Sequence, residues 1–402
     1  MALTEMQIAP TIRLDEASRR RWDVIVIGAG PGGTMAAREV ARSGASVLLV
    51  DRASFPRPKV CGCCVNGAAI RVLSDVGLSD LPRQLGAKEL RAIRLASGGR
   101  FANVPLTEGV TLSRERLDAA MLQAAIEAGV QFLDHTQAIV GTETNHARQV
   151  ILKSVDDERA ALSRSIVVAG GLGCRVFAEA EAEDRRVSPS SRVGAGTVLD
   201  VAPPQYCAGT IYMACHKHGY VGLVRLEDDR LDVAAALDAD AIKHFGGVAK
   251  LAAKILTDVK LLVPESFEGA TWHGTGRLTQ RRVRVAAERC FFIGDAAGYV
   301  EPFTGEGIAW ALASGRAVAP IVLQGLDDER ESTATREWTR QHRRLLAQRA
   351  RLCRGVSRLL RYPAIVTIAV RLLALAPLLA RPVVRSLNAS FQTSSTISKQ
   401  RR

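Results

Sequence analysis

The chain has 402 residues, of which 47% are hydrophobic and 24% are charged. This balance supplies a large apolar core, and it excludes an intrinsically disordered chain, a collagen-like repeat and a small disulfide-stapled domain. Eight cysteines are too few for a disulfide framework in a chain of this length, which favours reduced thiols and a cytoplasmic protein. The net charge of +13 is large enough to suggest a polyanionic partner.

The positive charge is concentrated near the C-terminus. Residues 336–402 contain fifteen Lys and Arg and a single acid, Glu337, so the first 335 residues carry a net charge of −1. The cations alternate with apolar stretches such as 363–380, PAIVTIAVRLLALAPLLA, in which Arg371 and Pro377 argue against a membrane-spanning helix. Two interpretations stay open: an interfacial helix on an anionic membrane at the inner face, or a helical cap on the protein body. Nucleic acid is not an expected partner.

The N-terminal part of the chain contains a dinucleotide-binding pattern. Residues 1–21 have no continuous apolar segment, so we expect a loose leader without a targeting signal. Residues 22–30, WDVIVIGAG, predict a buried parallel strand that ends in a glycine-rich turn. A helix ending at Gly44 and a second strand ending at Asp51 follow. Strand, turn, helix, strand and acid in this order indicate a site for adenosine diphosphate, which both NAD and FAD contain.

Each residue of that turn has an expected task. Gly28 permits a tight turn, Gly30 lets backbone N–H groups approach a pyrophosphate, and Gly33 lets the helix pack closely on the strand. Asp51 is placed to accept a hydrogen bond from a ribose hydroxyl. We count Pro31 and Arg52, which lie beside these residues, among the cofactor-binding candidates.

A second motif lies far downstream, after the strand-like run RCFFIG. A carboxylate at a strand end can accept hydroxyl groups, and a glycine-bounded helix start offers free N–H groups and a positive dipole to a flavin ring. The candidate residues are Gly294, Asp295, Ala296, Pro302, Gly305, Glu306 and Gly307.

Together the two motifs resemble the flavoprotein group of p-hydroxybenzoate hydroxylase-type monooxygenases, flavin-dependent halogenases and geranylgeranyl reductases. The resemblance implies non-covalent FAD and an α/β fold, in which a Rossmann-type FAD-binding domain carries an inserted, mostly antiparallel β-sheet substrate domain and a C-terminal helical region. It places Asp295 on a ribityl or ribose hydroxyl of FAD. The segment 113–118, SRERLD, resembles the family's R-x-x-L-D helix, which places Arg114 near the FAD phosphates or ribityl chain, while Asp118 is expected to support the first helical turn.

One short element indicates a branch of this group. Residues 59–62, Lys59-Val60-Cys61-Gly62, resemble the K-x-C-G element of the reductases, and the W-x-W-x-I-P segment of halogenases is missing. The Y-x-W-x-F-P segment of reductases is also missing, because residues 219–225 read GYVGLVR. The element predicts that Lys59, Cys61 and Gly62 line the flavin pocket, with Cys61 as the candidate catalytic residue. A redox dithiol of Cys61 and Cys64 is an alternative, and no second cysteine pair indicates a metal site.

The cluster His216, Lys217, His218 and Tyr220 invites a catalytic interpretation. The alternation in residues 210–237 instead predicts antiparallel strands, with a turn at HKHG and a hairpin near 227–230. We therefore expect these side chains to belong to a turn.

The order of motifs predicts how the chain is divided. We expect a leader at 1–21, an FAD-binding domain from 22–85, 111–178 and 283–325, a substrate domain from 86–110 and 179–282, and a basic helical region at 326–402. A second G-x-G-x-x-G is missing, so an external electron donor, either NAD(P)H or a reductase, must reduce the flavin.

Three functions are compatible with these motifs. The first is reduction of carbon–carbon double bonds in an isoprenoid or other hydrophobic substrate by hydride transfer from reduced FAD, with a proton from a pocket acid or water. The second is a monooxygenase that hydroxylates an aromatic or polyketide-like substrate through a flavin C4a-hydroperoxide. The third is a non-catalytic, flavin-bearing protein on a membrane. The K-x-C-G element favours the first.

Overall fold

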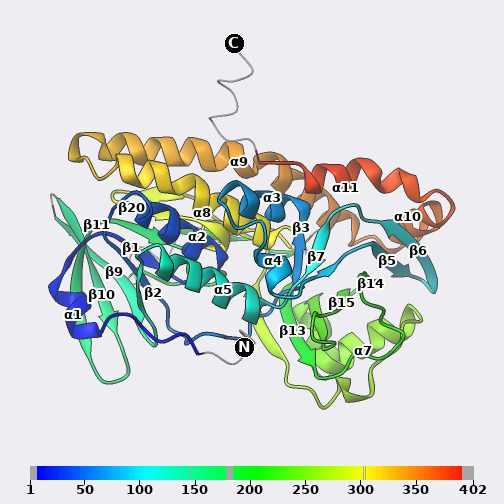
Figure 1. Ribbon diagram of the computed structural model, residues 1–402. Helices are drawn as coiled ribbons and strands as arrows, with labels where there is room; N and C mark the ends of the chain where they lie inside the picture. Colours follow the sequence, from blue (N-terminus) through cyan, green and yellow to red (C-terminus); the bar gives the residue numbers. More distant parts are fainter. Residues whose placement is uncertain (1–6, 145, 178–183, 302, 304, 392–402) are drawn as a thin grey trace, which may run out of the picture.

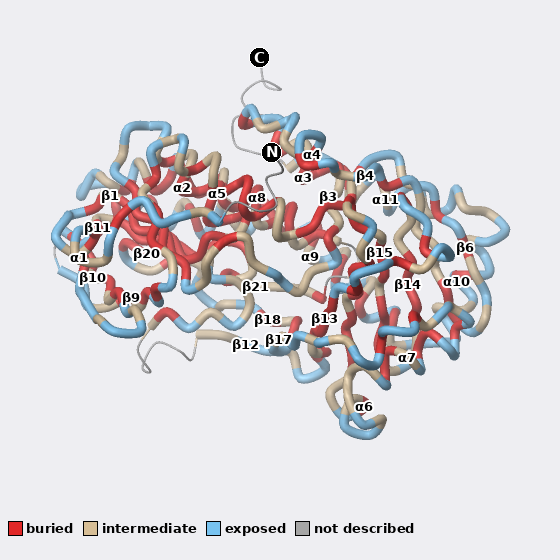
Figure 2. Tube along the Cα trace, turned by 60° about the horizontal axis from the view of Figure 1, so that its bottom comes forward, coloured by how far each residue is buried: buried red, intermediate tan, exposed pale blue. Residues whose placement is uncertain are grey.

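The computed structural model describes residues 7–144, 146–177, 184–301, 303 and 305–391. Two β-sheets lie at opposite ends of the molecule, and long helices run across one side of both (Figure 1). This arrangement confirms the expected α/β fold with an inserted, mostly antiparallel sheet. Buried backbone is concentrated in β1, β11 and β20 of one sheet and in β13 to β15 of the other (Figure 2).

The first sheet contains the predicted βαβ unit. Its strand order is β19-β20-β11-β1-β2-β8, and β9 and β10 extend it beyond β11. β1 pairs in parallel with both β2 and β11, and its alternate residues are buried in two apolar clusters, Val24 and Val26 in one and Ile25 and Ile27 in the other, as a run of β-branched residues predicts. The strands are β1 Arg21–Ile27, β2 Val47–Val50, β8 Gln131–Leu133, β9 Gln137–Thr144, β10 Ala147–Lys153, β11 Glu158–Val168, β19 Ala286–Ala287 and β20 Cys290–Phe292.

Helices from three distant parts of the chain cover this sheet. α2 (Pro31–Ala41), which follows the glycine turn, packs against both α5 (Arg114–Glu127) and α8 (Gly307–Gln324). α8 is long and apolar enough to cross a membrane, but 67% of it is buried inside the protein, as in a core helix. The shorter helices near this layer are α3 Gly67–Asp75, α4 Leu81–Gln84 and the one-turn segments η3 Gly294–Ala296 and η4 Asp328–Arg330.

Residues 7–20 differ from the expected loose leader. They form α1 (Leu14–Arg19), in which Ala17 is fully buried, and Trp22 Nε1 donates to Ala17 O at 2.9 Å. Ile12 is buried as well, so two apolar anchors attach a segment that lacks any long hydrophobic run.

The second sheet has seven strands in the order β17-β13-β16-β15-β14-β5-β6. One face packs on α7 (Val248–Asp258) through alternate residues such as Leu223 and Val233. The predicted hairpins are confirmed, because β14, β15 and β16 pair antiparallel with turns at 216–219 and 226–230. The strands are β5 Ala92–Ser97, β6 Arg100–Pro105, β13 Val193–Leu199, β14 Thr210–His216, β15 Gly219–Arg225, β16 Leu231–Leu237 and β17 His273–Arg277; α6 Ala239–His244 and η2 Glu265–Phe267 lie nearby.

Two small sheets connect the large ones. Their strands come from loops that leave one large sheet and enter the other. The first contains β3 Cys64–Asn66, β4 Lys88–Glu89 and β7 Gly109–Thr111, and the second contains β12 Arg185–Val187, β18 Gln280–Arg282 and β21 Gly298–Tyr299.

The basic C-terminal region is helical, as expected. α9 (Glu331–Leu359) packs on α8 and buries Trp338 completely, and α10 (Pro363–Leu375) lies on β5 and β6. The chain then turns by 119° into η5 (Pro377–Ala380) and α11 (Arg381–Asn388), so the two halves do not form one straight span.

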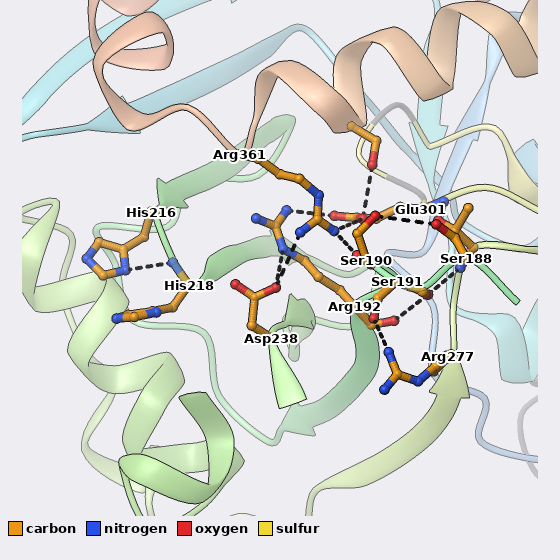
Figure 3. A network of polar contacts seen from close by, with 12 residues as sticks. Ser188, Ser190, Ser191, Arg192, His216, His218, Asp238, Arg277, Glu301 and Arg361 are labelled. Carbon is orange, nitrogen blue, oxygen red and sulfur yellow. Dashed lines mark hydrogen bonds and ion pairs between the residues drawn. The ribbon is translucent and has the colours of Figure 1, made fainter. Parts of the chain in front are cut away.

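A buried polar network fastens α9 to the second sheet (Figure 3). Glu301 accepts hydrogen bonds from Arg192 Nη1 at 2.8 Å and from Ser357 Oγ of α9 at 3.0 Å. Arg361, just after α9, lies 3.8 Å from Asp238 and 3.9 Å from Glu301. Because Glu301 and Arg192 are almost fully buried, the end of α9 is part of the fold.

Candidate active site

One cavity of about 1070 Å³ brings together most of the residues that the sequence singles out. Its walls come from both large sheets and from the C-terminal helices. The predicted cofactor-binding residues on these walls are Gly28, Gly30, Pro31, Asp51, Arg52, Lys59, Cys61, Gly62, Arg114, Gly294, Asp295, Gly305 and Gly307. Gly33, Ala296 and Glu306 lie outside the walls, and Pro302 lies outside the described residues.

The N-terminus of α2 forms a cationic cradle at one end of the cavity. Gly30 is the N-cap residue and has no side-chain cap, so the N–H groups of the first turn remain available. The Nη2 atoms of Arg57 and Arg114 both lie 3.9 Å from where a Cβ on Gly30 would stand. Two guanidinium groups opposite a helix N-terminus make a site for a phosphate or pyrophosphate.

The three glycines of the turn differ in their surroundings. Gly28 has a φ of 103°, and a Cβ there would meet Ala169 O at 2.7 Å. A Cβ on Gly33 would lie 1.8 Å from Gly28 O, so this glycine lets α2 pack against the turn. Gly30 has room for a Cβ. The fold therefore requires Gly28 and Gly33, whereas nothing in the protein itself fills the space at Gly30.

Arg114 is held in place by a carboxylate one helical turn away. Its Nε and Nη2 donate to the two oxygens of Asp118, both at 2.7 Å, and Asp118 is fully buried. The pKa of Arg114 lies well above its usual range, because the attraction of Asp118 outweighs the effect of burial. Asp118 thus positions a permanent cation at the cradle, which is a different role from the expected support of the first helical turn.

Asp51 lies at the opposite side of the cradle, at the end of β2. Its carboxylate accepts the N–H of Ala29 at 2.7 Å and the N–H of Ala53 at 3.0 Å, and Arg57 Nη2 lies 3.6 Å away. These contacts fix the Asp51 carboxylate beside the glycine turn, and Asp51 lines the cavity.

Asp295 and Lys59 face the cavity from the other side. Burial raises the pKa of Asp295 to about 6, although the positive charges of Lys59 and Arg114 act against this rise. Burial is also the main reason why the pKa of Lys59 is lowered. A buried carboxylate near the positive charges of Lys59 and Arg114 can accept hydrogen bonds from hydroxyl groups of a ligand.

We expect FAD binding to weaken as the pH falls through about 6, because protonation of Asp295 removes the charged acceptor. The apoprotein should show the opposite trend, losing stability as the pH rises from about 4 to about 6, since the folded state raises this pKa. Fluorescence titration with FAD between pH 5 and 8 tests the first statement, and thermal unfolding of the apoprotein tests the second. In Asp295→Asn neither the pH dependence of FAD binding nor that of apoprotein stability should remain near pH 6. A pH dependence that persists would be caused by another ionisable group.

The carboxylate of Glu306 points into the protein. Arg349 Nη1 of α9 donates to its two oxygens at 2.9 and 2.7 Å, and Trp310 Nε1 and Asn66 Nδ2 donate at 2.6 and 3.2 Å. Its position at the start of α8 suggests a cofactor contact, but its contacts join α8 to α9 and to the start of α3.

Cys61 lies on the cavity wall in the loop between β2 and β3. A hydrogen bond from the Cys63 thiol and the positive charge of Arg114 outweigh burial and lower the pKa of Cys61 to about 6. Burial instead raises the pKa of Cys64. The C-x-x-C pair therefore consists of one thiolate and one thiol at neutral pH.

We expect iodoacetamide to modify Cys61 faster than the exposed Cys207 at pH 7, because the thiolate is the nucleophile. The rate at Cys61 should fall as the pH drops through about 6. Peptide mass spectrometry of samples quenched at short times measures both rates in one protein. The Cys61→Ser variant identifies the peptide, and equal rates at the two cysteines at pH 7 would contradict the assignment.

The other end of the cavity is apolar. Ile93 and Leu95 of β5, together with Ile211 and Met213 of β14, form part of its floor. Side chains of the C-terminal helices close it from above, namely Ala369, Leu372, Leu373, Leu379, Ala380, Val383, Val384 and Leu387. The cradle and this apolar compartment belong to one continuous space.

The polar cluster of residues 216–220 is divided between the cavity wall and a turn outside it. Tyr220 lines the cavity, whereas His216 sits at the turn after β14 with its Nε2 3.3 Å from Asp258, and neither His216 nor His218 is on the wall. The expectation that the histidines belong to a turn is confirmed.

Several ionisable residues of the cavity were not singled out from the sequence, among them Arg57 and Asp232. Arg57 follows β2 in the run FPRPK, where a basic residue before the K-x-C-G element is the available signal. Asp232 lies on β16, and only the alternation of that strand indicates that it faces away from α7.

These residues fit FAD. Nε of Arg57 is buried and has no hydrogen-bond partner within the part of the chain that the structure describes, and the described atoms nearest to a Cβ on Gly30 are the two guanidinium tips at 3.9 Å, which leaves space at the N-terminus of α2 for a pyrophosphate. Asp51 and Asp295 would supply acceptors for ribose and ribityl hydroxyls, and the helix start at Gly307 lines the same cavity.

Comparisons with known proteins agree with this fit. The family model described as FAD binding domain matches residues 21–349. Digeranylgeranylglycerophospholipid reductase 3 of Methanosphaera stadtmanae is 26% identical over 320 residues, which are 76% of this chain and 78% of that protein. Geranylgeranyl diphosphate reductase of Rhodobacter capsulatus is 26% identical and covers 75% of each chain, and menaquinone reductase of Mycobacterium tuberculosis is 26% identical over 75% and 76% of the two chains.

The fold is also found in solved structures. The myxobacterial chondrochloren halogenase CndH superposes with a TM-score of 0.69 at 22% identity and covers 83% of this chain and 82% of its own. This likeness concerns the fold. With the family match over most of the chain and a cavity that fits the cofactor, the protein belongs to the FAD-binding domain family and is a FAD-dependent oxidoreductase.

Proposed function

We propose that the protein reduces carbon–carbon double bonds in an isoprenoid chain. The observation that carries this proposal is the continuous cavity, in which a cradle for FAD opens into a compartment lined by aliphatic side chains. A long hydrocarbon chain gains free energy from burial against such walls, whereas a small polar substrate does not. The curated relatives that are named as reductases of geranylgeranyl lipids and of menaquinone support the same substrate class.

In this proposal, different residues bind the cofactor and place the substrate. Arg57, Arg114 and the N-terminus of α2 hold the pyrophosphate of FAD, and Asp295 holds a hydroxyl group. The bound cofactor, once reduced, supplies a hydride. The aliphatic walls place the double bond next to it and keep water away, which strengthens every electrostatic interaction at the site. Cys61, whose pKa is lowered to about 6, adds a negative charge to the cavity wall near Arg114.

The electron donor comes from outside the protein in this proposal. The chain has a single G-x-G-x-x-G turn, and the FAD site uses it. A nicotinamide cofactor that binds transiently or a partner reductase would therefore deliver the electrons.

An anaerobic assay tests the reaction. The holoprotein is reduced with dithionite, and geranylgeranyl diphosphate or a geranylgeranyl lipid in detergent is added without oxygen. Oxidation of the flavin, together with a product that carries two more hydrogen atoms per double bond by mass spectrometry, supports reduction. Oxygenated product that forms only in air would assign the monooxygenase function instead.

We further propose that the substrate enters from an anionic lipid surface. Large apolar side chains of α10, η5 and α11 are exposed, and we call them the α10–α11 surface: Ile365 45%, Ile368 54%, Leu372 52%, Leu375 86%, Leu378 55%, Leu379 62% and Val383 41%. Arg371, Arg381 and Arg385 are exposed on the same helices, and no acidic residue lies between 338 and 391. Aliphatic side chains with arginines beside them match the acyl chains and phosphates of a membrane surface. Leu372 and Leu379 also line the cavity, so the surface leads to the compartment.

We expect Leu375→Ser/Leu379→Ser to lower sedimentation with anionic liposomes several-fold while the protein stays folded, because both side chains are mostly exposed. Val155→Ser is the matched control, since Val155 is 94% exposed in the turn between β10 and β11 at the other end of the molecule. Binding of the wild type should fall with added salt. If the wild type stays in solution with every lipid, or if both variants lose binding equally, the α10–α11 surface is not the lipid contact.

A further inference from the structure

Asp232 is an acidic residue on the otherwise apolar cavity face of the second sheet. On β16, Leu231, Val233 and Leu237 pack toward α7, so the strand alternation turns Asp232 and Ala234 to the opposite face. Both residues line the cavity. Among the described residues on its walls, Asp232 is the single carboxyl group that the strands of this sheet contribute.

The carboxyl group of Asp232 is buried without a charged partner in contact. The residue is 4% exposed, and its Oδ2 has no hydrogen-bond partner within the described part of the chain. Cys61 and Cys63, in the segment between β2 and β3, and Cys64, the first residue of β3, lie near the carboxyl group. From the neighbouring hairpin, Glu227 and Arg230 act on it at longer range.

This environment disfavours the ionised form. Burial raises the pKa of Asp232 well above its usual range, and the negative charge of Cys61 raises it further. Arg230 acts in the opposite direction, but its guanidinium donates to Asp228 at 3.0 Å and to Glu115 at 2.8 Å. The surroundings therefore favour the protonated carboxyl group of Asp232, beside a Cys61 thiol whose pKa is lowered to about 6.

A second pocket of about 710 Å³ lies behind the loop 58–61. Asp232 and Cys61 belong to the walls of both pockets, so they mark the partition between them. Part of the second pocket is lined by polar side chains, namely Ser113, Thr197, Asp200, Arg230, Ser266 and His273. A protonated acid between the two pockets can give its proton to one side and regain it from the other.

We propose that Asp232 is the general acid of the reduction and that the second pocket resupplies its proton; the assignment rests on the proposed function. Addition of hydrogen across a double bond needs a hydride and a proton, and the hydride brings the electron pair that reduces the substrate. The π electrons of the substrate form a new C–H bond with the proton of Asp232, the O–H bond breaks, and its electron pair stays on the carboxylate. The neighbouring carbon takes the hydride, and water in the second pocket reprotonates Asp232.

The Asp232→Asn variant tests the assignment, because an amide keeps the shape of the side chain but has no acidic proton. We expect unchanged FAD content and thermal stability, and anaerobic oxidation of the reduced enzyme by a geranylgeranyl lipid slowed about 10²- to 10⁴-fold. Asp232→Glu should restore part of the rate. The matched control is Asp229→Asn, which removes a carboxylate in the turn of the same hairpin, where the Asp229 side chain is 70% exposed.

An infrared measurement tests whether Asp232 is protonated without requiring the enzyme to turn over. The wild type at pH 7 should show the carbonyl stretch of a buried carboxylic acid, and Asp232→Asn should lack it while Asp229→Asn keeps it. If the wild type reduces no prenyl substrate but shows this band, the proposed reductase function is wrong, whereas Asp232 is still shown to be protonated. A wild-type spectrum without the band, or an Asp232→Asn variant with the wild-type rate and pH profile, overturns the assignment of Asp232.

Discussion

We expect the Gly30→Val variant to fold and to purify without FAD. A valine side chain has room at this position, since the nearest atoms to a Cβ are the guanidinium tips of Arg57 and Arg114 at 3.9 Å. It would, however, occupy the space in which the pyrophosphate meets the N-terminus of α2. Losing two charge-assisted hydrogen bonds costs about 3 kcal/mol or more, which is roughly a 100-fold weaker complex. Flavin absorbance per protein and an FAD titration by fluorescence give the result.

The control for this variant is Gly355→Val. Gly355 is exposed on α9, and no atom lies within 4 Å of a Cβ placed there. Both variants should unfold at temperatures close to that of the wild-type apoprotein, and only Gly30→Val should lose the cofactor. Full yellow colour in Gly30→Val would mean that the pyrophosphate lies elsewhere.

The second large effect concerns the ion pair between Glu306 and Arg349. The side chains are 3% and 8% exposed, and Arg349 also donates to the backbone carbonyls of Leu387, in the last turn of α11, and of Ala389, just after it. Removal of one partner leaves a buried charge without its counter-ion, so we expect Glu306→Ala to lower the free energy of unfolding by about 3–5 kcal/mol. Denaturation with urea, followed by tryptophan fluorescence, measures the loss.

A second ion pair of α8 provides the matched comparison. Arg316 lies 2.5 Å from Asp75, and the two side chains are 31% and 53% exposed. Arg316→Ala should cost less than about 1 kcal/mol, because water screens an exposed pair. The double variant Glu306→Leu/Arg349→Met should recover part of the loss, since it leaves no buried charge. A cost for Glu306→Ala as small as that for Arg316→Ala would show that the ion pair does not hold α9.

The same contacts bear on the choice between a cap and a membrane helix. α9 is a structural cap, because Trp338 and Arg349 are buried in it and Ser357 joins the Glu301 network. The α10–α11 surface lies beyond this cap. Deletion of the chain after Arg349 would remove the end of α9 together with the lipid candidate, so point changes on the exposed face separate the two roles better than a truncation does.

The sequence by itself determined the cofactor and the fold class. Gly28, Gly30 and Gly33 occur within six residues, and the two strands beside them are continuous apolar runs. Such features are local, because strand formation, turn geometry and the start of a helix depend on a few neighbouring residues. The alternation in 210–237 predicted the hairpins of the second sheet for the same reason.

Only the tertiary structure decided which side chains face which partner. Glu306 looks like a cofactor ligand in its motif, yet its partner Arg349 lies 43 residues later in the chain. Arg57 joins Arg114 opposite Gly30, and Asp232 meets the loop of Cys61 and Cys63, although the chain gives no local sign that Arg57 or Asp232 lies there. Burial sets the charge of these groups, and burial depends on every element packed around them. The basic C-terminal region shows the same limit: its helices are predictable from composition, but which of their apolar faces is covered follows from the shape of the sheet beneath them.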